Sequence, residues 1–429
     1  MNCSFLEAKM FNFATNYYLC TCLVRDIYMK KIVLLFLVLC CEATGYSMDI
    51  ESTMPSDTLY VASADIDDVA TTDTAVSETP KKKSFFNKVI DYFADANKKN
   101  DKKFDFSVIG GPHYSSDTQL GLGLVGAGLY RIDRSDTIMQ PSNVSIFGDV
   151  STVGFFLLGV RGNNFFPKDR FRLNYNAYLY SFPSSYWGIG YEQGDNDGNQ
   201  TDLKYFQARF RVDFMVRVVK NLYIGPLLIF DFAKVKELSR PNVFGDQPQV
   251  VRNYGFGAMM SFDNRDVVTN PHHGVYAYLT QMFRPSWMWN DYAFSTTEFG
   301  FSTYHKVWRG GILAYQLTGR FNFGDPAWAM MSRLGGSNSM RGYYEGRYRD
   351  KHMLTTQLEL RQNIYHRIGG VVWVGAGNVF HNKETFKKIL PNYGLGFRWE
   401  FKKNVNVRLD YGFGKKGQSC FLFNINEAF

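Results

Sequence analysis

The chain has 429 residues, a formal net charge of +8 and a mean hydropathy of −0.24. Aromatic residues make up 17% of the sequence and there are 38 glycines, more of both than an ordinary soluble domain uses. The positive charges are scattered instead of being gathered in one stretch, which excludes the basic patch of a nucleic-acid-binding protein.

The only long apolar run lies near the start of the chain. Residues 32–41 read IVLLFLVLCC, follow Lys30 and Lys31, and precede the small residues that end a secretory signal. The run is too short to span a bilayer, which takes about 20 helical residues. We therefore predict a non-mature leader over 1–47, with Met29 as the start of a signal peptide over 29–47. Only Cys420 lies beyond it, so one chain can form neither a disulfide framework nor a cysteine metal site.

Two segments separate the leader from the rest of the chain. Residues 48–83 are small, acidic and almost free of aromatic side chains, so they cannot bury enough apolar surface to fold alone. They are predicted to form a polar periplasmic linker. Residues 84–103 are predicted to form one short amphipathic helix, because Ser84 can cap its start and apolar residues follow at helical spacing.

From residue 104 to 429, segments of about ten residues alternate apolar and polar side chains and are separated by turn residues. In NVNVRLDYGF, Val407 and Leu409 point to one face while Arg408 and Asp410 point to the other. This pattern is typical of a transmembrane barrel, in which one face meets lipid and the other the lumen. We predict an all-β fold, a transmembrane antiparallel β-barrel of about sixteen strands. A soluble sandwich would alternate too, but the signal peptide favours the membrane.

The lengths of the connections predict the orientation of this barrel. With the N-terminus in the periplasm, the long connections 182–201, 233–250 and 323–352 are extracellular, as outer-membrane barrels require. The stretches 132–141 and 263–272 are exceptions, since they should be short. The predicted location is the outer membrane of a Gram-negative-type envelope, with outer-membrane lipids as partners.

The last predicted strand, 419–429, is aromatic on one face. Phe421, Phe423, Ile425 and the final Phe429 are expected to form a C-terminal signal that barrel-assembly machinery reads during biogenesis, although Glu427 interrupts the pattern. An open apolar edge would be an aggregation hazard that closure of a barrel removes. Removal of Phe429 is expected to impair assembly.

Four stretches of this region resemble the BamA/TamA superfamily of outer-membrane proteins, also called the bacterial surface antigen family. Met340, Arg341, Gly342 and Tyr343 match the family's aliphatic-Arg-Gly-aromatic tetrad. In the family this tetrad lies in the sixth extracellular loop, which folds into the lumen. The strand prediction independently puts the segment between strands eleven and twelve.

The other matching stretches flank this tetrad. SFDNRDVVTNPHHG resembles the family's Asp-x-Arg-Asp turn motif, with the matching residues Asp263, Arg265, Asp266, Pro271 and Gly274. QLELR resembles the acid-bearing twelfth strand, and VVWVGAGNVF the thirteenth, while LDYGF and the final Phe resemble the end of the family's barrel.

The resemblance implies that Arg341 is paired with acidic side chains in the lumen. Glu359 stands at the acid of the twelfth strand, but Gly375 replaces the aspartate of the thirteenth. Glu359 is therefore the expected partner of Arg341, and Asp410, which alternates onto the lumen face, is an alternative.

By resemblance, the chain is expected to assist insertion or export of proteins or lipids, using the seam between its first and last strands. Family members carry POTRA domains before the barrel, and residues 48–103 are too few and too polar for one, so a POTRA-less variant is expected. Two alternatives stay open: a passive porin-like channel, since sixteen strands can enclose an aqueous pore, and a membrane-embedded enzyme or receptor. The seven histidines are scattered and no nucleophile elbow is present, so no catalytic residue, metal or cofactor is predicted.

Overall fold

A computed structural model describes residues 104–115, 119–132, 142–402 and 404–429. The predicted leader, linker and amphipathic helix lie outside the described residues. All described residues belong to one compact unit.

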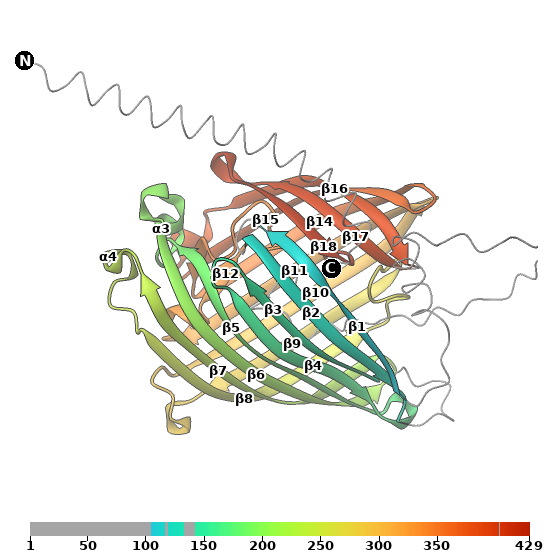
Figure 1. Ribbon diagram of the computed structural model, residues 1–429, viewed down its shortest axis with the longest axis horizontal. Helices are drawn as coiled ribbons and strands as arrows, with labels where there is room; N and C mark the ends of the chain where they lie inside the picture. Colours follow the sequence, from blue (N-terminus) through green and yellow to red (C-terminus); the bar gives the residue numbers. More distant parts are fainter. Residues whose placement is uncertain (1–103, 116–118, 133–141, 403) are drawn as a thin grey trace, which may run out of the picture. The chain divides into compact units, whose positions relative to one another are not determined.

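The main element is one antiparallel sheet of sixteen strands, in which strands adjacent in the chain are neighbours throughout, apart from an inserted hairpin between β11 and β14. The sheet curves round into a barrel wall (Figure 1). This confirms the predicted all-β barrel of about sixteen strands. The strands are β1 (Phe104–Ser115), β2 (Gln119–Tyr130), β3 (Ser142–Ser151), β4 (Phe156–Phe165), β5 (Phe171–Tyr186), β6 (Thr201–Val219), β7 (Leu222–Leu238), β8 (Val250–Asp263), β9 (Gly274–Arg284), β10 (Phe294–Trp308), β11 (Gly311–Gly324), β14 (His352–Tyr365), β15 (Ile368–Phe380), β16 (Leu390–Lys402), β17 (Val405–Phe413) and β18 (Ser419–Ile425).

The two faces of the wall differ as the alternation predicts. In β14, Gln357, Glu359 and Arg361 are almost fully buried, while Leu358 between them is 40% exposed. Successive strand side chains point to opposite faces, so the polar residues face the lumen and the leucine faces outward. Other strands expose apolar side chains in the same way, including Leu120, Leu122, Leu124, Ile146, Leu158, Leu228, Val372, Val374 and Leu395. The outer face is therefore apolar, while the inner face is polar on β14 and mixed on β7, where Leu227 and Ile229 are buried beside Asp231.

The two ends of the wall also differ. At one end, here called the turn end, connections such as 220–221, 309–310 and 366–367 are tight. At the other, the loop end, longer connections carry the short helices α3 (Tyr191–Asp195), α4 (Pro241–Phe244) and α5 (Lys383–Phe386). Figure 1 shows α3 and α4 at the same end. Within the described parts of the chain, no helix is long and apolar enough to cross a membrane.

The longest loop-end connection, 325–351, contains the hairpin of β12 (Ser332–Leu334) and β13 (Tyr348–Asp350). We call it the inward loop, because much of it is buried inside the wall.

The last strand is shorter than the sequence predicts. It ends at Ile425 instead of Phe429, and Asn426 adopts a left-handed backbone conformation with φ of 69°. Asparagine tolerates this conformation better than most residues. The predicted strand 419–429 is wrong over its last four residues, which leave the sheet.

Candidate functional site

The inward loop forms a small core of its own against the inner wall. Leu334, Met340, Tyr343 and Tyr348 are at most 1% exposed and pack with Tyr191, Met353, Val379 and Leu390. The cluster joins the loop to α3, β14, β15 and β16. Apolar burial of this kind contributes about 1.5–3 kcal/mol for each large side chain, so the loop is held by packing as well as by charge.

The backbone of the inward loop lies directly on β17. A Cβ atom at Gly342 would come within 2.3 Å of the main-chain carbon of Phe413, and one at Gly412 within 2.2 Å of the Arg341 carbonyl oxygen. Only glycines allow so close an approach of two backbones. The hydroxyl of Tyr343 strengthens the contact by donating to the Pro391 carbonyl (2.6 Å) and accepting from the Lys415 N–H (2.8 Å).

Arg341 is held between two carboxylates, and all three side chains are fully buried. Its Nη2 donates to Glu359 and its Nη1 to Asp410 at 2.7 Å. The structure thus brings together Arg341 and both acids that the sequence singled out, instead of choosing between them. Charge-assisted bonds from a planar guanidinium fix orientation as well as charge.

The indole ring of Trp373 on β15 completes the surroundings of Arg341. The guanidinium carbon lies 3.7 Å from the ring centroid, a cation–π contact. Gly375, which stands where the family aspartate is expected, faces no open space: a Cβ there would come within 2.7 Å of the Thr356 carbonyl oxygen. Asp410 on β17 supplies the second carboxylate.

The two carboxylates are shared with further lumen arginines. Arg361 Nε donates to Glu359 at 2.7 Å, and Arg398 Nη1 donates to Asp410 at 2.6 Å. Buried charges are tolerated when they are paired in this way. The site is therefore a continuous ion network on β14, β16 and β17 with the inward loop at its centre.

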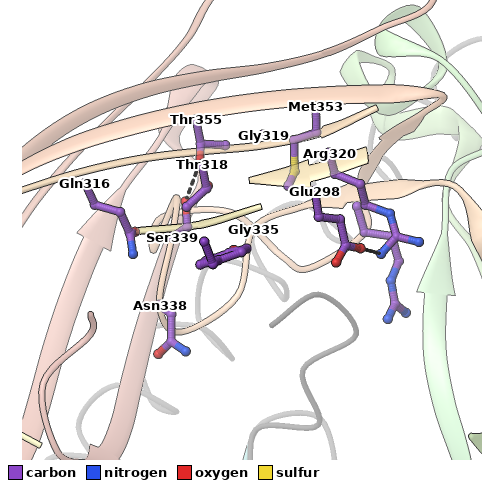
Figure 2. A pocket seen from close by; sticks show the side chains of 12 residues that line it. Glu298, Gln316, Thr318, Gly319, Arg320, Gly335, Asn338, Ser339, Met353 and Thr355 are labelled. Atoms are coloured by element: carbon purple, nitrogen blue, oxygen red, sulfur yellow. Dashed lines mark hydrogen bonds and ion pairs between the residues drawn. The ribbon is translucent and has the colours of Figure 1, made fainter. Parts of the chain in front are cut away.

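Nearer the hairpin, the inward loop leaves a small polar cavity against the wall (Figure 2). It measures about 50 Å³, room for a few water molecules. Its walls include the Glu298–Arg320 ion pair (2.7 Å) and the bond between the Thr318 and Thr355 hydroxyls (2.7 Å). Asn338, Ser339 and Gly335 of the loop face them (Figure 2). The cavity is too small for an organic substrate.

The turn motif forms a separate local structure at the turn end. Arg265 donates to both carboxylate oxygens of Asp263 (2.9 and 2.8 Å) and lies over the Tyr276 ring. Gly274 has φ of 114°, and a Cβ there would come within 2.7 Å of the Asn264 carbonyl oxygen, so glycine is required. Pro271 is buried at this turn. These contacts are all local, so the motif shapes the turn.

Asp266 closes the turn through the backbone. Its Oδ1 accepts from the N–H groups of His272 (2.9 Å) and His273 (3.1 Å). Burial alone would raise the pKa of Asp266, but these two N–H groups together with the neighbouring imidazoles of His272 and His273 hold the pKa below its ordinary value. Within the described residues, no group of three or more histidine, cysteine or acidic side chains is placed to hold a metal ion.

Because the pKa of Asp266 is lowered on folding, its carboxylate stabilises the turn above its ordinary pKa of 3.8, and this contribution is lost as the pH falls through the lowered value. We expect Asp266→Ala to weaken the turn at neutral pH by about 1 kcal/mol and to remove its acid sensitivity. Hydrogen exchange of residues 264–273 from about pH 2 to about pH 7, a window that extends below the ordinary aspartate pKa, measures both. Equal pH profiles for the variant and the parent chain would contradict the assignment.

The residues of the expected C-terminal signal do not share one face. Phe421 is 43% exposed on β18, whereas Phe429 has left the strand and lies near Tyr304 of β10, with ring centroids 6.1 Å apart. The prediction that Phe429 continues the aromatic face of the strand is wrong, because the chain turns at Asn426.

Sequence reasoning missed three contributors to the network: Trp373, Arg398 and Glu427. An inward Trp373 could have been found, since Val372 and Val374 beside it are 54% and 58% exposed and alternation places it on the other face. No local sequence pattern marks Arg398 and Glu427 as members of the network, because their partners are distant in the sequence.

A sixteen-stranded sheet with an apolar outer face and a long arginine-bearing loop folded inside defines an outer-membrane-type barrel. The Omp85 superfamily domain matches residues 161–429. The chain belongs to the Omp85 superfamily.

Solved structures agree with this fold. The chain is similar to BamA from Haemophilus ducreyi lacking POTRA domains 1–3, with 13% identity, a TM-score of 0.50 and coverage of 75% of this chain and 68% of that one. It is also similar to CdiB from Escherichia coli, with 11% identity, a TM-score of 0.52 and coverage of 76% and 63%. The chain thus spans less than two thirds of that CdiB. No curated protein sequence matches it.

Proposed function

We propose that this barrel resides in the outer membrane and assists insertion or export of proteins or lipids there, with the inward loop as its moving part. The observation that carries the proposal is the buried Arg341, held between Glu359 and Asp410 at the centre of the lumen wall. These ion pairs stabilise the position of the inward loop inside the lumen. Without them, the loop could move out of the lumen into solvent.

The occupied lumen favours this role over a passive channel. An open pore has no need of a loop whose tetrad is fully buried, nor of an arginine that shares two carboxylates. Ion pairs between the loop and the wall instead suit a barrel whose loop has two positions, one inside the lumen and one outside. A few ion pairs can bias the equilibrium between two such positions.

Depletion of the protein, followed by quantitative proteomics and lipid analysis of the outer membrane, tests the proposal. We expect selective loss of a set of outer-membrane proteins or of a lipid class, restored by the parent chain but not by Arg341→Ala. Unchanged composition together with a large, steady conductance of the purified barrel in planar bilayers would contradict the proposal and support the channel.

A further inference from the structure

The segment that follows the last strand, Asn426–Phe429, turns into the barrel. We call it the tail segment. The N–H of Asn426 donates to the Asn406 carbonyl oxygen (2.7 Å), and that of Glu427 to the Thr269 carbonyl oxygen (3.3 Å). Ala428 is 2% exposed. The tail segment is therefore anchored to the inner wall at the turn end and is not a loose extension of β18.

Glu427 has both carboxylate oxygens occupied. Oε2 accepts from Arg398 Nε at 2.8 Å and lies 3.8 Å from Arg361 Nε, and Oε1 accepts from Asn406 Nδ2 at 2.7 Å. The side chain is only 2% exposed. A carboxylate so placed between two guanidinium groups is bound by the wall in the manner of a ligand.

Phe429 fills the position beside it. Its ring lies 5.2 Å from the guanidinium carbon of Arg361 and 6.1 Å from the ring of Tyr304, and its main-chain oxygen accepts from Arg361 Nη2 at 2.9 Å. Tyr304 itself is 1% exposed. The wall thus presents an aromatic and cationic surface to the ring of Phe429. This surface lies at a fixed distance from the arginines that bind the Glu427 carboxylate.

The same arginines connect the tail segment to the inward loop. Arg361 also binds Glu359, Arg398 also binds Asp410, and both of these acids bind Arg341. Three carboxylates and three guanidinium groups therefore alternate around a closed ring: Arg341, Glu359, Arg361, Glu427, Arg398 and Asp410. Arg408 also lies 3.7 Å from Asp410. Without Glu427, four arginines would therefore share two acids, and Arg341 would lose part of its hold.

We propose that Arg361, Arg398, Asn406 and Tyr304 form a peptide-binding site on the inner wall. The site takes a segment with a carboxylate and an aromatic ring two residues apart. Glu427 and Phe429 occupy it in cis, and their presence holds the inward loop in the lumen. This inference deepens the proposed function and rests on it only for the role that release of the loop would have. The tests below measure peptide binding and the position of the loop in the purified barrel.

The binding test uses the full chain in nanodiscs and a fluorescent peptide of sequence Asn-Ile-Asn-Glu-Ala-Phe with a blocked C-terminal amide. A tethered segment competes at an effective concentration on the order of mM, so the parent chain should bind the free peptide weakly. Glu427→Ala with Phe429→Ala empties the site, and we expect this variant to bind the peptide about tenfold more tightly or better. Adding Arg361→Ala should abolish the gain. Equal binding by the parent and the emptied chain, or equal binding of a scrambled peptide, would overturn the site.

The loop test uses the single substitution Glu427→Gln, which preserves size. We expect several-fold faster protease cleavage within 335–352, with Glu384→Gln on α5, where the side chain is 81% exposed, as a matched control that changes nothing. In the emptied variant, added peptide should restore protection. Restored protection would show that occupation of the site, and not general misfolding, controls the loop. A cleavage rate that changes neither with Glu427→Gln nor with added peptide would disprove the coupling between the site and the loop.

A third measurement does not depend on the stability of the emptied variant. In a chain whose six native cysteines are replaced by serine, the pair Tyr304→Cys and Phe429→Cys should be joined by a short bismaleimide in the assembled barrel. Failure to cross-link, with free labelling of the cysteine at 429 from solution, would place the tail segment outside the site. These results are independent of outer-membrane composition, so a failed site and a failed proposed function can be told apart.

Discussion

Arg341→Ala should release the inward loop while leaving the sixteen-stranded wall intact. The substitution removes the one cation that bonds both Glu359 and Asp410 at full burial. Removing one partner of a buried pair costs about 3–5 kcal/mol, because it leaves uncompensated charge behind. Arg361 and Arg398 still neutralise part of that charge, so we expect the lower end of this range. Even so, the loop equilibrium should shift by about a hundredfold or more.

Protease cleavage within 335–352 measures this release, and the mobility of unheated samples on SDS gels checks that the barrel has folded. Lys351→Ala is the matched control: it lies in the same loop, but its side chain is 35% exposed and its acidic partner, Asp325, is 91% exposed, and exposed pairs contribute only about 0–1 kcal/mol. Arg341→Lys should be intermediate, since an ammonium cannot bond both acids as a planar fork does. Cleavage rates that are equal for Arg341→Ala and the parent chain would mean that charge does not hold the loop.

Gly342→Ala should also release the loop, by sterics alone. The added methyl group would meet three main-chain atoms of Phe413 and Gly414 within 2.7 Å, and a backbone in a sheet cannot move aside as a flexible side chain can. Inserting a methyl into a packed site costs typically about 1–3 kcal/mol, and contact with backbone on every side places this one at the upper end. All charges of the network remain present.

The control for this prediction is Gly148→Ala on β3, where an added methyl would make only ordinary contacts at 3.7 and 3.8 Å. It should leave cleavage within 335–352 unchanged. Arg341→Ala and Gly342→Ala act on one loop, so their effects should be less than additive in the double variant. Full protection of the loop in Gly342→Ala would show that its backbone does not dock on β17 as described.

The local pattern of the sequence was sufficient for the wall and for part of the site. A strand repeats every two residues, so the alternation in QLELR and NVNVRLDYGF already places Glu359, Arg361 and Asp410 on one face. The resemblance of the tetrad at 340–343 to the BamA/TamA family marked the loop that enters the lumen. The turn at Asp263–Gly274 was equally readable, because the five residues of its motif lie within eleven residues of one another.

Only the tertiary structure decided which of these inward groups meet. The alternation of apolar and polar residues predicts which face of the sheet a side chain lies on. It does not predict which distant strands the curvature and register of the sheet bring within reach of one loop. Asp410 lies 69 residues from Arg341 in the chain, yet bonds it directly. The approach depends on two glycines, Gly342 in the loop and Gly412 on β17, each of which lies against the backbone of the other segment. In the sequence, Glu427 interrupts the pattern of an aromatic strand. In the structure it closes the ion network, because a single left-handed residue, Asn426, turns the chain inward. Sequence thus determined the faces, and the three-dimensional path of the chain determined the partners.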